Sequence, residues 1–182
     1  IHSINIQSGI FCLMKDRFQD IIWVGADGQG IYMYFTDEFS IENVLLDVPE
    51  YRVNNPVRAL FLDHEQTLWI GTKGGGILRM MDFHPDRETL PQAERILANN
   101  SALMDNSVYS FAPGRRNSLW IGTEDGLNYY SYLTRRIEEF PVIADGKKVK
   151  YVHSICETND STLWVVSAGE GIVKITLEAS SS

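Results

Sequence analysis

The sequence predicts an all-β protein, a β-propeller of about four four-stranded antiparallel blades. A tryptophan-centred phrase occurs four times, with its tryptophans at positions 23, 69, 120 and 164. Their spacing of about 45 residues is the size of one propeller blade. The apolar runs around them are about five residues long, which suits strands and is too short for helices. No segment shows sustained helical periodicity.

The four copies divide the whole chain into blades and leave no linker or second domain. The expected blades span about 7–48, 55–98, 105–142 and 149–178. Each blade begins with a short apolar strand that lies innermost in a propeller, and Pro and Asn residues between the copies are typical of turns. These inner strands are expected at Ile10–Met14, Val57–Leu62, Val108–Ala112 and Val152–Cys156.

The second strand of each blade contains the tryptophan. Its apolar residues are consecutive rather than alternating, which indicates burial on both faces, as between two neighbouring blades. A side chain repeated at one position of every blade is expected to pack between blades. Trp23, Trp69, Trp120 and Trp164 are therefore predicted to form the structural core.

A glycine-rich turn follows each tryptophan strand. Asp27-Gly28 and Asp125-Gly126 are strong hairpin signals, because glycine supplies the positive φ of a tight turn. Third strands are expected to begin at Ile31, Ile77, Leu127 and Ile172. More polar outer strands are expected near Glu42–Leu46, Glu94–Leu97 and Ile137–Phe140, and the fourth repeat has no outer strand before Ser182.

Composition excludes several classes of protein. The 16 basic and 24 acidic residues give a net charge of −8, which disfavours nucleic acid and anionic lipid as partners. No apolar run approaches the roughly 20 residues of a membrane-spanning helix. Two cysteines make no disulfide framework, and Cys12 and Cys156 are expected to be free, buried and apolar in character.

Motifs of catalysis and of cofactor or metal binding are absent from the sequence. The four histidines match no metal-ligand spacing, and there is no nucleophile elbow, phosphate loop or dinucleotide fingerprint. No carboxylate pair is placed in acid/base geometry by its spacing. We therefore expect this segment to be no enzyme and to hold no cofactor or metal.

Every blade has the same tryptophan, but the second residue of the inner strand differs from blade to blade. This residue is Phe11, Arg58, Tyr109 or His153, and it lies at the face where the glycine-rich turns also lie. Those turns bring Asp27, Lys73, Glu124 and Asp125. Such a channel mouth suits hydrogen bonding to sugar hydroxyls or pairing with an acidic sugar. The alternative is that these side chains only line a solvated channel.

The repeats resemble the two-component regulator propeller family. Leu68–Gly76 and Leu119–Leu127 match its phrase well, and Ile22–Ile31 and Leu163–Ile172 match more loosely. The resemblance implies part of a ring with more blades than this chain carries. It also implies the periplasmic sensor region of a bacterial hybrid two-component histidine kinase, anchored in the inner membrane by parts of the parent protein not present here. An oligosaccharide or other small ligand is the implied partner.

The sequence leaves two alternatives to ligand sensing open, a protein-binding propeller scaffold and a carbohydrate-active propeller enzyme. Ring closure is also open. A strand from His2–Ile6 would complete the fourth blade and close a four-bladed ring. Against closure by four blades, the end blades would expose the apolar surface of their tryptophan strands. We therefore expect a fragment of a larger propeller that self-associates through its end blades, as in a homodimer, and a head-to-tail pair would complete an eight-bladed ring.

Overall fold

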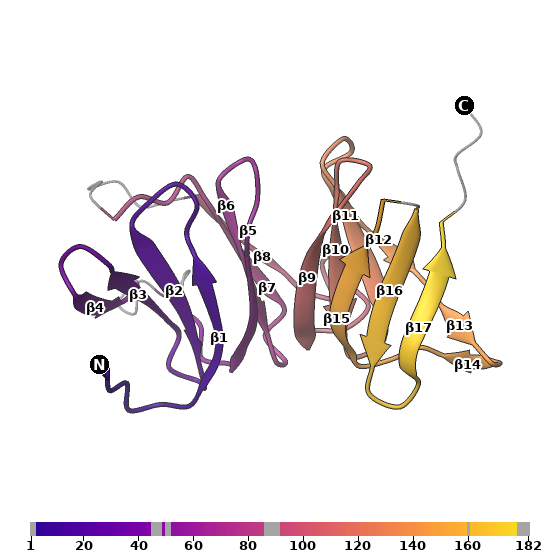
Figure 1. The fold of residues 1–182 in the computed structure, drawn as a ribbon, viewed down its shortest axis with the longest axis horizontal. Coiled ribbons are helices and arrows are strands. Elements are labelled where there is room, and N and C mark those ends of the chain that lie inside the picture. Colours follow the sequence, from indigo (N-terminus) through magenta and orange to yellow (C-terminus); the bar gives the residue numbers. More distant parts are fainter. Residues whose placement is uncertain (1–2, 45–48, 50–51, 86–91, 160, 178–182) are drawn as a thin grey trace.

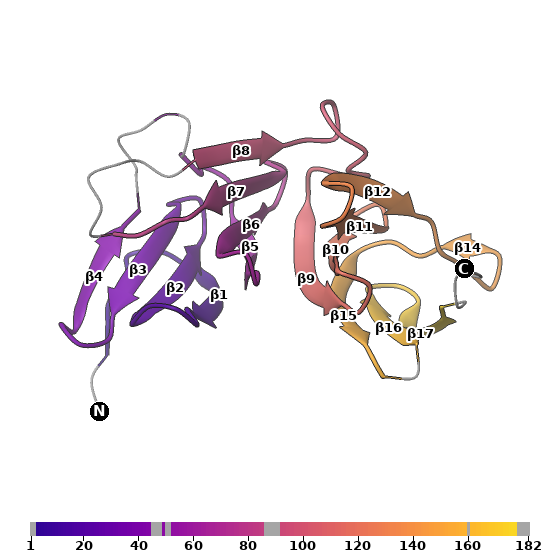
Figure 2. The ribbon, with the colours of Figure 1, turned by 90° about the horizontal axis from the view of Figure 1, so that it is seen from above.

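Four antiparallel β-sheets follow one another along the chain as the blades of an open arc (Figures 1 and 2). The structure is a computed structural model that describes residues 3–44, 49, 52–85, 92–159 and 161–177. Within these residues every regular element is a strand, and no helix has the length and hydropathy to cross a bilayer. The fold is thus all-β, a partial β-propeller.

Each blade is a simple meander from an inner to an outer strand. Blade 1 contains β1 (Ile10–Lys15), β2 (Ile21–Ala26), β3 (Ile31–Phe35) and β4 (Ser40–Asn43). Blade 2 contains β5 (Val57–Leu62), β6 (Thr67–Thr72), β7 (Ile77–Met81) and β8 (Gln92–Ile96). Blade 3 contains β9 (Val108–Gly114), β10 (Ser118–Thr123), β11 (Leu127–Ser131) and β12 (Arg136–Phe140).

Blade 4 is a sheet of three described strands, β15 (Val152–Glu157), β16 (Thr162–Ser167) and β17 (Gly171–Thr176). A small hairpin of β13 (Ile143–Ala144) and β14 (Lys147–Lys148) precedes it. Ser3–Ile6 form no strand, and His2 lies outside the described residues, as does Leu46 of the first expected outer strand. The sheet of the fourth blade is therefore not completed by residues 3–6.

The inner strands β1, β5, β9 and β15 lie side by side along the concave side of the arc (Figure 2). Apolar residues fill the three junctions between blades. Three of the tryptophans pack against the blade that follows them: Trp23 contributes to the first junction, Trp69 to the second and Trp120 to the third. Burial between two sheets explains why their strands are apolar at consecutive positions.

Trp164 departs from the burial expected for all four tryptophans. The exposed fractions of Trp23, Trp69 and Trp120 are 1%, 0% and 5%, but that of Trp164 is 39%. Its ring points to the side of blade 4 that no described blade covers. Cys156 pairs with Trp164 across the sheet and is also exposed, which corrects the expectation that it is buried. Both cysteines are free, as expected, and Cys12 is half-buried.

Buried carboxylates hold the first two tryptophans. The indole N–H of Trp23 donates to Asp16 at 2.9 Å, and that of Trp69 donates to Asp63 at 2.8 Å. Both aspartates also accept backbone N–H groups of the turn after the inner strand. Blade 3 has Gly114 at this position, and the indole of Trp120 instead donates to Glu157 of blade 4, at 2.7 Å. Each of these three buried indole N–H groups thus has an acceptor.

Candidate ligand-binding site

The variable residues of the four inner strands form one continuous row. The guanidinium carbon of Arg58 lies 4.3 Å from the ring centre of Phe11 and 5.8 Å from that of Tyr109. The ring centres of Tyr109 and His153 are 4.7 Å apart. Phe11 and His153 are exposed and the two central residues are half-buried. We call these four residues the mouth row.

A β-bulge positions each member of the mouth row. In every blade the register between the inner strand and the tryptophan strand slips by one residue, and the extra residue is Phe11, Arg58, Tyr109 or His153. A bulge leaves one residue without a partner and re-aims its side chain. The sequence carries no mark of this slip, because an extra residue in one strand alters neither the polarity pattern nor the turn residues.

Glu124, in the glycine-rich turn after β10, is hydrogen-bonded to the mouth row. The hydroxyl of Tyr109 donates to Glu124 Oε2 at 2.9 Å, which ties the turn after β10 to the mouth row. Burial raises the pKa of Tyr109 to about 12, and the hydrogen bond to Glu124 acts in the same direction. Tyr109 is therefore neutral at physiological pH, and its single hydroxyl proton goes to Glu124. Its hydroxyl oxygen can still accept a hydrogen bond, and Arg58 provides donors beside it.

Asp125 has lysine partners outside the mouth row. Its carboxylate lies 2.6 Å from Lys148 Nζ and 2.9 Å from Lys150 Nζ. These two hydrogen bonds hold the pKa of Asp125 below its usual range. Asp27 and Lys73 are exposed in the turns of blades 1 and 2, where their backbone N–H groups bond to Gly9 and Pro56. The structure thus joins Glu124 to the row, while Asp125 anchors the segment before β15.

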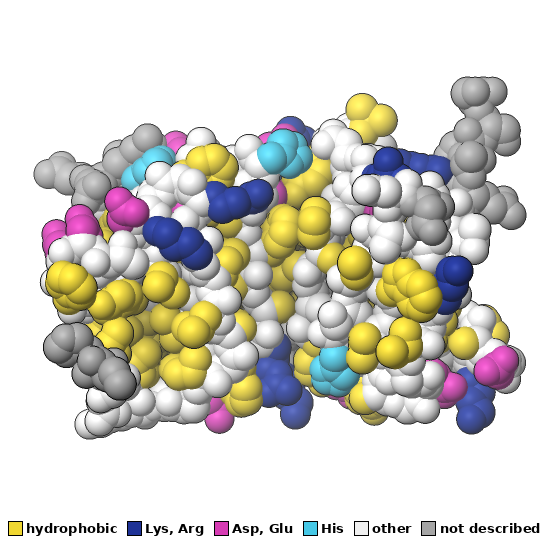
Figure 3. Space-filling view, viewed as in Figure 1, with side chains coloured by type: hydrophobic (Ala, Val, Ile, Leu, Met, Phe, Trp, Pro, Cys, Tyr) yellow, Lys and Arg dark blue, Asp and Glu magenta, His cyan; other side chains and the backbone are white. Residues whose placement is uncertain are grey.

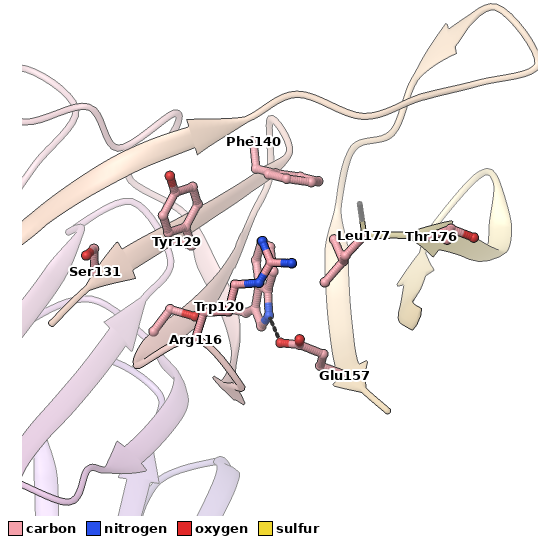
Figure 4. Close-up of a pocket in the computed structure, with 9 residues that line it drawn as sticks. Arg116, Trp120, Tyr129, Ser131, Phe140, Glu157, Thr176 and Leu177 are labelled. Atoms are coloured by element: carbon pink, nitrogen blue, oxygen red, sulfur yellow. Dashed lines mark hydrogen bonds between the residues drawn. The ribbon is translucent and has the colours of Figure 1, made fainter. Parts of the chain in front are cut away.

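A hollow at the rim between blades 3 and 4 was not anticipated from the sequence. It encloses about 630 Å³ and is lined by aromatic side chains of blade 3, with Glu157 and Leu177 opposite (Figure 4). At the preceding junction, Tyr130 and Tyr132 fill this space. The strand registers place Ile175 and Leu177 at the same repeat positions in blade 4, and these smaller side chains leave the hollow.

The rim hollow combines aromatic surface with charged ends. The ring of Trp120 lies 5.7 Å from that of Tyr129 and 5.1 Å from that of Phe140, between centres, while Arg116 and Glu157 supply the charges. The signal in the sequence was the difference between Tyr130 and Tyr132 in the third repeat and Ile175 and Leu177 in the fourth. Within the described residues, no group of three or more histidine, cysteine or acidic side chains forms a metal site.

The repeats also match known proteins. Residues 52–74 and 102–125 match the family described as two component regulator propeller, in blades 2 and 3. Blades 2 and 3 each contain a segment similar to this repeat. Over 181 residues it is 27% identical to histidine kinase P4 of Formosa agariphila, and it spans 97% of its own length but 13% of that kinase.

Solved structures support the propeller fold. The extracellular domain assigned to a hybrid two component system of B. thetaiotaomicron superimposes with a TM-score of 0.62 at 18% identity, covering 97% of this chain and 28% of that one. The computationally designed Ika4 protein gives a TM-score of 0.59 at 13% identity, covering 96% and 94%. PorZ of Porphyromonas gingivalis gives 0.53 at 14% identity, covering 92% and 32%. The chain therefore spans only a small part of the length of the kinase and of the extracellular domain that it resembles.

Proposed function

We propose that this propeller segment senses a ligand in the periplasm for a membrane-anchored histidine kinase, and that the ligand is an oligosaccharide bound at the mouth row. The single observation that carries the proposal is the bulge repeated in all four inner strands. It turns one side chain per blade into a shared row, and the identity of that side chain differs from blade to blade. A ligand that spans several blades needs different contacts on each of them.

The chemistry of the row suits a sugar. The exposed rings of Phe11 and His153 offer apolar surface to the C–H face of a pyranose. Between them the guanidinium of Arg58 offers hydrogen-bond donors, and the hydroxyl oxygen of Tyr109, whose proton goes to Glu124, offers an acceptor. Arg58 also favours a carboxylate-bearing sugar over a neutral one, because charge-assisted bidentate hydrogen bonds are strong. The likeness to histidine kinase P4 and to an extracellular sensor domain supports the signalling context.

Thermal-shift screening of the 182-residue protein against neutral and acidic oligosaccharides tests this function. We expect stabilisation without turnover of the sugar. Once a binder is found, Arg58→Ala and Tyr109→Ala should each weaken binding by about tenfold or more. This is the size of effect expected when a hydrogen bond between the protein and the ligand is lost.

Arg116→Ala at the rim hollow is the matched control, since it removes a guanidinium from the other aromatic cluster. Circular dichroism checks that all three variants fold. Unchanged affinity in Arg58→Ala and Tyr109→Ala would remove the mouth row as the site. Loss of affinity in Arg116→Ala alone would assign binding to the rim hollow instead, and hydrolysis of the sugar would favour an enzyme.

A further inference from the structure

Arg58, in the middle of the mouth row, has no anionic partner among the described residues. Its guanidinium carbon lies between two rings, 4.3 Å from the centre of Phe11 and 5.8 Å from that of Tyr109, and it forms no hydrogen bond or ion pair with a described group. The side chain is half-buried, although the chain as a whole has a net charge of −8. A guanidinium held in this way favours charge-assisted hydrogen bonds to a carboxylate or another oxyanion.

The two carboxylates of the glycine-rich turn after β10 are bound to other groups. Glu124 Oε2 accepts the hydroxyl proton of Tyr109 at 2.9 Å. The carboxylate of Asp125 lies 2.6 Å and 2.9 Å from the ammonium groups of two lysines in the segment before β15. Neither carboxylate is paired with Arg58, so this turn does not neutralise the guanidinium.

The immediate surroundings of Arg58 are complete within this chain. Arg58 belongs to β5 of blade 2, and β5 contacts β1 of blade 1 on one side and β9 of blade 3 on the other. Both neighbouring blades already contribute a ring next to the guanidinium. Over the lower ends of β5, β9 and β15, Figure 3 shows basic side chains and a histidine beside hydrophobic ones. The mouth row therefore presents its positive charge on an open surface.

Tyr109 offers the opposite chemistry next to Arg58. Burial and the hydrogen bond to Glu124 raise the pKa of Tyr109 to about 12, so the hydroxyl keeps its proton at neutral pH. Because that proton is donated to Glu124, the lone pairs of the oxygen can only accept a hydrogen bond from a ligand. This oxygen suits a sugar hydroxyl. The negative charge of Glu124 beside it disfavours an anion at Tyr109 and leaves Arg58 as the place for one.

We propose that blades 2 and 3 form an acidic-sugar subsite within the mouth row, in which Arg58 binds the carboxylate or sulfate of a sugar residue and the oxygen of Tyr109 accepts a proton from one of its hydroxyl groups. Glu124 determines this division, because it holds the Tyr109 proton and repels an anion from that position. The subsite rests on the proposed function for its location, and it adds the class of sugar that the mouth row selects.

Three monosaccharides built on one ring test the subsite: galactose, galacturonate and galactose 6-sulfate. Each is titrated into the 182-residue protein at constant ionic strength, while nuclear magnetic resonance follows the Nε–H of Arg58 and the backbone amides of blades 2 and 3. At least one of the two anionic sugars should give saturable shifts at Arg58 and Tyr109, with an affinity about tenfold or more above that of galactose. The comparison between the two shows whether the subsite takes a carboxylate or a sulfate.

Substitutions at Arg58 separate its geometry from its charge. Arg58→Gln should abolish the difference in affinity between the charged and the neutral sugar. Arg58→Lys should retain only part of it, because lysine keeps the charge but lacks the planar fork of donors. Arg136→Gln is the matched control, since it removes one positive charge from an exposed position on β12 and should leave all three titrations unchanged. Circular dichroism establishes that the variants fold.

Substitutions at Tyr109 and Glu124 test the division between anion and hydroxyl. Tyr109→Phe should weaken the binding of charged and neutral sugars by a similar factor, because both lose the acceptor of a hydroxyl proton. Glu124→Gln should strengthen the binding of the anionic sugar and leave that of galactose unchanged, because it removes a like charge beside the subsite. Weaker binding of the anionic sugar in Glu124→Gln would contradict the role given to this carboxylate.

The remaining outcomes separate the subsite from the proposed function. Equal affinities for galactose and both anionic sugars, or shifts that do not involve Arg58, would overturn the acidic-sugar subsite. An oligosaccharide that binds at the mouth row equally well with and without its charged groups would overturn the subsite and support the proposed function. Binding of galacturonate or galactose 6-sulfate at Arg58, with no binding of any longer sugar, would support the subsite and contradict the sensing of an oligosaccharide.

Discussion

At the scale of single residues, the repeat position of each tryptophan determines which blade covers it. The rings of Trp23, Trp69 and Trp120 pack forward, against the next blade, and their indole N–H groups take acceptors from their own blade or from the next one. Repetition in the sequence was sufficient to predict a packing role. It was not sufficient to predict the exposure of Trp164, because a tryptophan is buried only where another blade lies against its sheet.

Because a tryptophan is covered only by the blade that follows it, replacing two different tryptophans with alanine should lower the free energy of unfolding by different amounts. Trp69→Ala should lower the free energy of unfolding by about 3–5 kcal/mol, since it empties a fully buried site. Trp164→Ala should cost far less in dilute protein, where its ring borders solvent. Urea unfolding at a concentration that keeps the protein monomeric measures both. Equal losses would contradict the assignment of Trp164 to an uncovered face.

The two thiols should differ in reactivity. Burial raises the pKa of Cys12 to about 11, so its reactive thiolate is scarce at neutral pH, whereas Cys156 is exposed. Treatment of dilute native protein with a thiol reagent, followed by peptide mass spectrometry, should label Cys156 first. Raising the pH toward 11 should accelerate labelling of Cys12. Comparable rates for both at neutral pH would disprove the buried setting of Cys12.

At the scale of elements, the glycine turns determine how closely a strand approaches its neighbour. Gly76 immediately precedes β7 with φ of +69°, and a Cβ on it would lie 2.2 Å from the carbonyl oxygen of Ile96. Gly146 in the β13–β14 hairpin has a similar φ of +78° and no atom within 4 Å of such a Cβ. Both glycines thus have a left-handed backbone conformation, but only at Gly76 would a Cβ also clash with a neighbouring strand.

Replacing each glycine with alanine distinguishes the cost of the backbone conformation from the cost of the steric clash. Gly146→Ala should cost about 1 kcal/mol, the penalty of a left-handed conformation for a residue with a Cβ. Gly76→Ala should cost clearly more, because a backbone carbonyl must also shift. Urea unfolding of both variants gives the comparison. A smaller effect at Gly76 than at Gly146 would mean that the β7–β8 contact yields easily.

The link between Asp125 and its lysines should make the segment before β15 sensitive to acid. The folded pKa of Asp125 is lowered, so the carboxylate stabilises the folded state above its unfolded pKa of about 3.9, and this contribution is lost as pH falls toward the folded pKa. The difference in melting temperature between the parent protein and Asp125→Asn should be constant near neutral pH and shrink below about pH 4. A difference that does not depend on pH would exclude this linkage.

Much of the element order follows from the sequence, and the exceptions have physical causes. Short apolar runs between turn residues predicted the strands of each blade. The β13–β14 hairpin was overlooked although Asp145-Gly146 is a strong hairpin signal, because its strands are only two residues long. The mouth row was predicted as a set of residues. Its bulges were not, because a register slip is decided by pairing between strands and not by residue type.

At the scale of the whole molecule, the open arc behaves as a linear series in which contacts run between successive blades. Ile31 lies in the first junction and Leu163 in the third, within separate core clusters. In dilute protein, Ile31→Val and Leu163→Ala should therefore have effects on the free energy of unfolding that add to within about 0.5 kcal/mol. Urea unfolding of the two single variants and the double variant tests this. A larger coupling in the monomer would indicate direct contact between the ends of the arc.

The forward coverage of the tryptophans has a consequence for synthesis on the ribosome. Each completed blade covers the indole made before it and exposes its own, so a nascent chain with any number of finished blades carries one uncovered indole, at its growing end. In this chain that indole belongs to Trp164. Fluorescence from that partly exposed indole should therefore change when a further blade packs against it.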